Sequence, residues 1–206
     1  MKLTYDRPVF VCGAPRSGTS MTMQMLAAGG LPTCGEYPAY EPDEVSVTGR
    51  NMVRLARQGV GRAAKILDPH RTPGWAKNPK PFVIWTRRMY RPQAQSQAKF
   101  LRLLGVNLVS VQIDGLEASL PATELEAFAL FRRVGIDDVL DLSFETTIQN
   151  PHSTAAAMAA AFGPGFDAAA AAGAVRSRTL GCLAGMLEFD LLEFDIANQT
   201  QRSGSG

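Results

Sequence analysis

The sequence has little net charge, few cysteines and no long apolar run. Lysine and arginine together number 21, against 19 aspartates and glutamates, so the formal net charge is only +2. A chain this close to neutral has no bulk attraction for nucleic acid, and we predict no nucleic-acid partner. No apolar stretch is long enough to span a bilayer, so we predict no membrane partner.

The three cysteines are Cys12, Cys34 and Cys182. Because their number is odd and Cys12 lies in an apolar segment, we expect free thiols in a reducing compartment. The first four residues lead directly into that segment and leave no room for a signal peptide, so we expect a cytoplasmic protein. No cluster of metal-ligand residues is visible, and we predict no metal site.

The chain is organised around a glycine-bracketed loop near its start. The apolar run at 9–12 predicts a short buried strand, and residues 19–28 predict a helix that ends at two glycines. Between them, Gly13 and Gly18 have the spacing of the first half of a P-loop. The N–H groups of such a loop and the positive end of the helix dipole favour an anion, so this segment predicts an oxyanion site.

The loop departs from an ordinary ATPase or GTPase P-loop at one position. Thr19 stands where the motif has its lysine, and Arg16 is the available cation. A guanidinium can hold two oxygens of a phosphate or sulfate at once. The loop therefore predicts an oxyanion ligand and argues against a Mg²⁺-bound triphosphate.

Strands and helices alternate along the rest of the chain. Apolar runs predict further strands at 63–69 (ended by Pro69), 81–86 and 139–144, and helical patterns occupy 45–60, 91–104, 120–134 and 154–162. The alternation predicts an α/β fold, a three-layer sandwich with a mostly parallel central sheet, as in P-loop NTPases. Ligands of such sheets bind at the carboxyl ends of the strands, so we expect three segments to lie side by side: 13–20, 68–71 and 87–91.

The other segments are less regular. We expect residues 31–42 to form a loop and Ser153 to cap the helix at 154–162, while the pattern at 106–113 fits either an edge strand or a helix. The segment 186–196 is acidic and apolar, and we expect it to cover the core, with a homodimer contact as the alternative. We place a single domain at residues 1–202, because the Ser-Gly repeat at 203–206 is typical of an added linker.

Three motifs resemble those of sulfotransferases. Residues 13–20, Gly-Ala-Pro-Arg-Ser-Gly-Thr-Ser, resemble the loop that binds the 5′-phosphosulfate in that family. Arg88-x-x-Arg91-x-x-x-x-Ser96 is similar to the family's 3′-phosphate motif, and 143–151 is similar to its Tyr-Glu-Asp-Leu-x-x-x-Pro segment. The resemblance implies transfer of a sulfuryl group from 3′-phosphoadenosine 5′-phosphosulfate (PAPS), with 3′-phosphoadenosine 5′-phosphate (PAP) as product.

The resemblance also implies roles for individual residues. The 5′-phosphosulfate would be held by five residues of the loop: Arg16, Ser17, Gly18, Thr19 and Ser20. Arg88 and Ser96 would hold the 3′-phosphate. The acceptor would be a hydroxyl or amine of a small molecule or carbohydrate, which the sequence does not name.

The chain departs from the family pattern in two places. Met89-Tyr90 replace the Asp-Pro that follows the first arginine of the 3′-phosphate motif. Leu67-Asp68 stand where much of the family has a lysine beside the leaving group, and strand alternation predicts that Lys65 points elsewhere.

Two residues are candidates for the base that removes the acceptor's proton. Glu36 follows the loop helix, where some bacterial carbohydrate sulfotransferases have a glutamate base. His70 follows the second predicted strand and resembles the histidine base of cytosolic members. Two other functions stay open: a P-loop nucleotide or small-molecule kinase, with Asp68 as the Mg²⁺-binding acid, and a non-catalytic nucleotide-binding relative.

Overall fold

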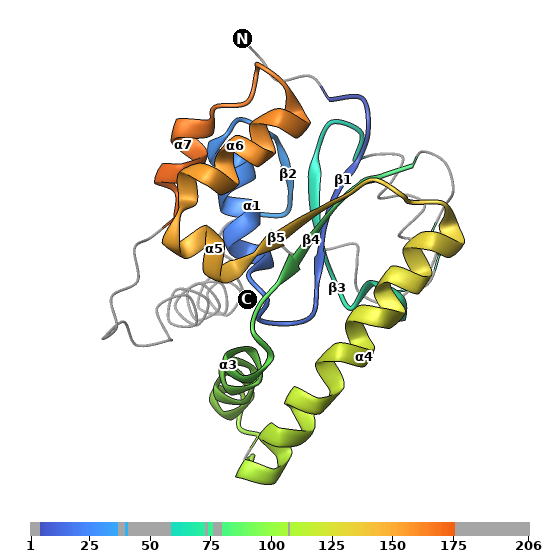
Figure 1. Ribbon diagram of the computed structural model, residues 1–206, viewed down its shortest axis with the longest axis vertical. Helices are drawn as coiled ribbons and strands as arrows, with labels where there is room; N and C mark the ends of the chain where they lie inside the picture. The colour runs from blue at the N-terminus through green and yellow to red at the C-terminus, as the bar shows by residue number, and fades with distance from the viewer. Residues whose placement is uncertain are drawn as a thin grey trace, which may run out of the picture.

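The computed structural model describes residues 5–36, 40, 59–72, 74–75, 80–106 and 108–175. Its centre is a five-stranded sheet in the order β2-β3-β1-β4-β5 (Figure 1). The strands are β1 (Val9–Gly13), β2 (Thr33–Cys34), β3 (Ala63–Leu67), β4 (Phe82–Arg87) and β5 (Val139–Ser143). Every neighbouring pair of these strands is parallel, so their carboxyl ends form one edge.

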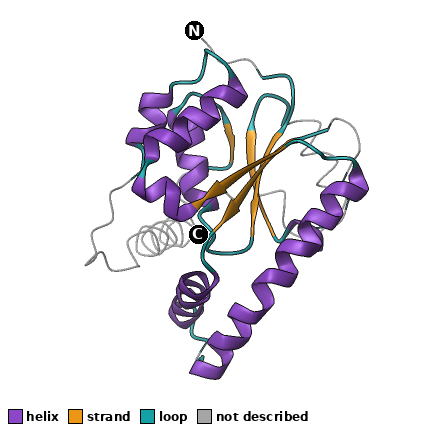
Figure 2. Ribbon diagram, in the orientation of Figure 1, coloured by secondary structure: helices purple, strands orange, loops and turns teal. Residues whose placement is uncertain are grey.

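Helices cover both faces of the sheet, which confirms the predicted three-layer α/β architecture (Figure 2). On one face lie α1 (Thr19–Ala28), α6 (Pro151–Phe162) and α7 (Ala168–Gly173), and α4 (Ser110–Val134) crosses the other. The remaining helical elements lie at the carboxyl edge: α3 (Tyr90–Leu103), α5 (Phe144–Gln149) and a 3₁₀ turn, η1 (Pro69–Arg71).

Strand alternation divides the core between the two faces. Val9 and Val11 of β1 pack with Met23 of α1, whereas Phe10 and Cys12 pack with helix α4. All four β1 side chains are buried, which is why this strand is a continuous apolar run in the sequence. Burial raises the pKa of the Cys12 thiol, so Cys12 is an inert core residue.

One predicted helix start and one predicted loop need correction. The helix expected at 120–134 begins ten residues earlier, at Ser110, and continues through Pro121. The apolar contacts that its carboxyl-terminal half makes in the core outweigh the backbone hydrogen bond lost at that proline. The segment 31–42, predicted as a loop, contains β2, which pairs with only two residues of β3 at the sheet edge.

The ends of two other elements also differ from the prediction. Strand β5 stops at Ser143, one residue before the predicted strand end. The Ser143 side chain accepts the N–H of Thr146 and so caps α5, which begins at Phe144. Helix α6 begins at Pro151, and its cap is Asn150, not Ser153; the Asn150 side chain accepts the N–H of Ser153.

Several predictions fall outside the described residues. These are residues 45–58 of the predicted helix at 45–60, the element at 186–196 and the proposed linker at 203–206; residues 59–60 are a turn and an isolated bridge. The boundary of the domain at residue 202 therefore stays a prediction. Within the part of the chain that the structure describes, no helix has the length and apolar character needed to cross a bilayer.

Candidate anion-binding site at the carboxyl edge of the sheet

The glycine loop joins β1 to α1 at the carboxyl edge. Gly18, at φ 113°, is the residue before α1, and Arg16 has φ 68°. A positive φ in an arginine is strained, and such strain is typical of functional loops. At Gly13 a Cβ atom would lie 2.4 Å from Ser17 Oγ and 2.5 Å from Thr86 Oγ1, so the loop fits against β4 only with glycine there.

The Ser17 side chain holds the loop in place. Its hydroxyl is 2.7 Å from the Thr86 hydroxyl, which in turn donates to the Cys12 carbonyl at 3.2 Å. Ser17 is 1% exposed, and its hydroxyl is occupied by this contact. Ser17 would therefore meet an anion through its backbone N–H group and not through its hydroxyl.

Arg16 and Ser96 are in direct contact, although 80 residues separate them. Arg16 Nε donates to Ser96 Oγ at 3.2 Å, and its guanidinium lies over the Phe100 ring at 5.4 Å from the centroid. Both partners come from α3, which packs beside the loop. The fold thus brings together two residues that the resemblance assigned to different phosphates.

Arg88 joins the same group from the end of β4. Its Nη1 donates to the Arg16 carbonyl at 3.3 Å, and its guanidinium lies 4.4 Å from the centroid of the Phe144 ring. Gln93 adds a further link, because its side-chain N–H donates to the Pro15 carbonyl at 2.9 Å. The loop, the end of β4 and the start of α3 therefore form one connected cationic surface.

Lys65 corrects a prediction, because its side chain points toward the loop helix. The register pairs Lys65 with Val11, on the face that α1 covers, and Lys65 Nζ is 3.4 Å from Ser20 Oγ. The residue is 5% exposed. Alternation along β3 was the right rule, but the prediction assigned Lys65 to the wrong face. A single lysine in an apolar strand was the signal, since a buried ammonium needs polar partners.

The two candidate bases follow neighbouring strands. Glu36 is exposed and lies two residues beyond β2, and His70 lies in η1 just beyond β3. His70 Nε2 is 3.2 Å from Glu126 of α4, and its Nδ1 is buried without a hydrogen-bond partner among the described residues. His70 is therefore held against α4, on the opposite face of the sheet from α1.

Asp68 lies beside the start of the loop. Its N–H donates to the Gly13 carbonyl at 3.1 Å, and its φ of 45° is left-handed. Burial raises the pKa of its carboxyl group, and the charges of His70 and Arg71 oppose that shift. The expectation that residues 13–20, 68–71 and 87–91 meet at one edge is confirmed for their backbones.

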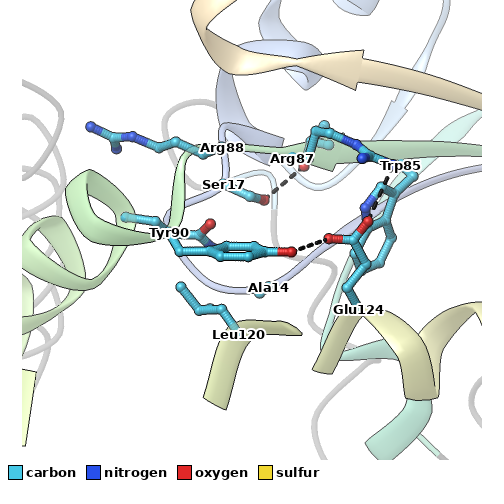
Figure 3. A pocket seen from close by; sticks show the side chains of 10 residues that line it. Ala14, Ser17, Trp85, Arg87, Arg88, Tyr90, Leu120 and Glu124 are labelled. Atoms are coloured by element: carbon cyan, nitrogen blue, oxygen red, sulfur yellow. Dashed lines mark hydrogen bonds and ion pairs between the residues drawn. The ribbon is translucent and has the colours of Figure 1, made fainter. Parts of the chain in front are cut away.

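Arg87 and Arg88 point in opposite directions, as Figure 3 shows. Arg87 lies on the α4 side, where its Nε donates to Asp141 at 2.7 Å and its Nη2 is 3.2 Å from Glu124. Glu124 also accepts the Tyr90 hydroxyl at 3.0 Å. These acids occupy Arg87, so of the two arginines Arg88 is the one that faces the loop. Arg87 and Arg88 both line a cavity of about 290 Å³, together with Met89 and Glu145.

The parallel sheet with a strand, a glycine loop and a helix at its carboxyl edge defines an α/β protein with a P-loop-like fold. Among solved structures, the chain is similar to the sulfotransferase domain from the Synechococcus PCC 7002 olefin synthase. The two share 17% sequence identity with a TM-score of 0.53, over 91% of this chain and 86% of that one. A likeness at this identity shows a common fold. No family model matches the chain, and neither does any curated protein.

Proposed function

We propose that this protein is a PAPS-dependent sulfotransferase acting on a hydroxyl or amine of a small molecule or carbohydrate. The observation that carries the proposal is the contact of Arg88 and Ser96 with the glycine loop, through Arg16. An anion on the loop and a second anion at Arg88 would lie close together there, as they do in a nucleotide phosphorylated on both its 3′ and 5′ oxygens. The likeness in fold to a sulfotransferase domain supports the same conclusion.

The charges of the residues present suit such a nucleotide. Two guanidiniums and the Lys65 ammonium lie at one edge, beside a loop that leads into the amino-terminal end of α1. No cluster of metal-ligand side chains is found in the described part of the chain. In this proposal the N–H groups of 17–20 and the hydroxyls of Thr19 and Ser20 bind the 5′ end, and Arg88 with Ser96 binds the 3′-phosphate.

PAPS, when bound, supplies the activated sulfuryl group. The acceptor oxygen or nitrogen bonds to sulfur as the bond from sulfur to the phosphate oxygen breaks, and the acceptor's proton passes to a base. Arg16 and Lys65 would neutralise the charge that builds on the departing phosphate oxygen. Positioning and electrostatic stabilisation would therefore supply most of the rate enhancement, as in phosphoryl transfer.

For the base we propose Glu36 ahead of His70. Glu36 is exposed at the carboxyl edge, whereas the Nε2 of His70 is engaged by Glu126. Replacing the base by glutamine should lower the transfer rate by a factor of about 10² to 10⁴ with PAP binding unchanged. A Glu36→Gln enzyme that keeps the full rate, beside a His70→Gln enzyme that loses it, would reverse the assignment.

The kinase alternative draws on Asp68, which lies next to the loop where a Mg²⁺-binding acid would act. Thermal unfolding in the presence of PAP, and separately of ATP with Mg²⁺, distinguishes the two functions. The sulfotransferase proposal expects PAP to raise Tm more than ATP/Mg²⁺ at equal concentration. Stabilisation by ATP/Mg²⁺ alone would refute it. Stabilisation by PAP without sulfate transfer to a broad panel of acceptors would favour a non-catalytic nucleotide-binding protein.

A further inference from the structure

The corner between β5 and α5 contacts Arg88 and the residue after it. Glu145 Oε1 accepts the backbone N–H of Met89 at 3.1 Å, and the Phe144 ring lies under the Arg88 guanidinium. These contacts link residues 56 positions apart, at the carboxyl ends of the adjacent strands β4 and β5. The corner thus holds both the side chain of Arg88 and the backbone that follows it.

Glu145 is itself fixed in position. Ser143 Oγ lies 3.2 Å from Glu145 Oε2 and also accepts the N–H of Thr146 at 3.3 Å. Met89, on the other side of the contact, precedes α3 and offers no side-chain cap to that helix. Glu145 therefore orients the start of α3 from outside the helix, with one carboxylate oxygen on Met89 and the other on Ser143.

Phe144 contacts both the glycine loop and Arg88. A Cβ atom at Gly18 would lie 2.8 Å from Phe144 Cδ2, so the ring is packed directly against the loop. Its face is 4.4 Å from the Arg88 guanidinium carbon, within the range of a cation–π interaction. The ring thus supports the guanidinium from beside Gly18, while Arg88 Nη1 reaches the Arg16 carbonyl directly.

We propose that Phe144 and Glu145 are positioning residues: they hold the Arg88 guanidinium against the glycine loop, and they thereby determine selectivity for a nucleotide that carries a 3′-phosphate as well as a 5′-phosphate. The selectivity part rests on the proposed function. The positioning part rests only on contacts within the protein.

Calorimetric titration with PAP and with AMP, which lacks the 3′-phosphate, tests the selectivity. Glu145→Ala should lower the PAP-over-AMP preference about tenfold, the cost of one charge-assisted hydrogen bond displaced from its geometry, with AMP affinity unchanged. Glu145→Gln keeps an oxygen that accepts the Met89 N–H and should retain most of the preference. The matched control is Asp138→Asn, because Asp138 precedes β5 at its other end and contacts Arg7 instead. If Glu145→Ala weakened the binding of PAP and of AMP equally, the inference would be overturned.

A second measurement on the ligand-free protein keeps the positioning claim separate from the function. The chemical shift of the Arg88 Nε–H depends on the ring current of Phe144. Hydrogen exchange at the Met89 N–H reports its hydrogen bond to Glu145. Phe144→Leu should shift the Arg88 signal, and Glu145→Ala should shift it and also speed exchange at Met89. An Arg88 signal that stays in place in both variants would refute the positioning. A wild-type protein without any PAP-over-AMP preference would refute the proposed function, while these two signals still decide the positioning.

Discussion

Replacing Arg88 by alanine should reduce recognition of a 3′-phosphate specifically. Arg88 reaches the glycine loop through its 3.3 Å bond to the Arg16 carbonyl, and it is stacked on Phe144. A hydrogen bond between charged groups contributes about 1.5–3 kcal/mol, which is about 10- to 150-fold in affinity. The loss of the stacking and of the bond to Arg16 affects the protein whichever nucleotide is bound, so that part cancels when two nucleotides are compared.

The assay is calorimetric Kd measurement for PAP and AMP on wild-type and Arg88→Ala protein at one fixed salt concentration, because salt screens phosphate contacts. We expect the PAP Kd to rise at least tenfold more than the AMP Kd. Arg88→Lys is the matched control: it keeps the charge, loses the planar fork, and should give an intermediate loss. Equal losses for PAP and AMP would remove Arg88 from the 3′-phosphate site.

Three further predictions concern the loop and its neighbours. Lys65→Gln should weaken the binding of PAP and of AMP by about tenfold, since both carry the 5′-phosphate. The affinity for 3′-AMP should stay unchanged in the same titrations. Gly13→Ala should destabilise the protein by about 1–3 kcal/mol in urea unfolding, because its Cβ would lie 2.9 Å from the Thr86 carbonyl oxygen as well as against two hydroxyls. Asp68 has a raised folded-state pKa, so its contribution to stability is present below its unfolded pKa and is lost as pH rises through the folded value. Asp68→Asn should therefore raise Tm more at pH 7.5 than at pH 3.5, and an equal change at both would contradict the burial argument.

Much of the fold follows from local patterns. Residues 9–12 are apolar without interruption because β1 lies between two strands and under helices on both faces. The uninterrupted run was therefore enough to predict a buried strand. The α4 start was not predictable in this way: Pro121 is a strong local signal for a helix start, and only the apolar contacts of the completed helix override it. Strand β2 was missed because two residues are too few to show alternation.

Some residues of the candidate site could also be predicted from local motifs, and others could not. The sequence indicated Gly13 and Gly18 through their spacing, and Arg88 and Ser96 through the resemblance of their motif to one of sulfotransferases, because each pair lies within one local segment. The contacts of Lys65 with Ser20, and of Glu145 with Met89, join residues 45 and 56 positions apart. No local pattern encodes such pairings, since they depend on strand register and on which helix covers each face.

Local sequence patterns were sufficient to predict the α/β class and the glycine loop, with arginine in place of the missing lysine, because backbone geometry and periodicity are local properties. The meeting of Arg16, Arg88 and Ser96 depends on tertiary contacts, as do the directions of Lys65 toward α1 and of His70 toward Glu126. The physical reason is the parallel register: it aligns the carboxyl ends of five strands at one edge, and packing on either side of the sheet then selects the direction of each side chain.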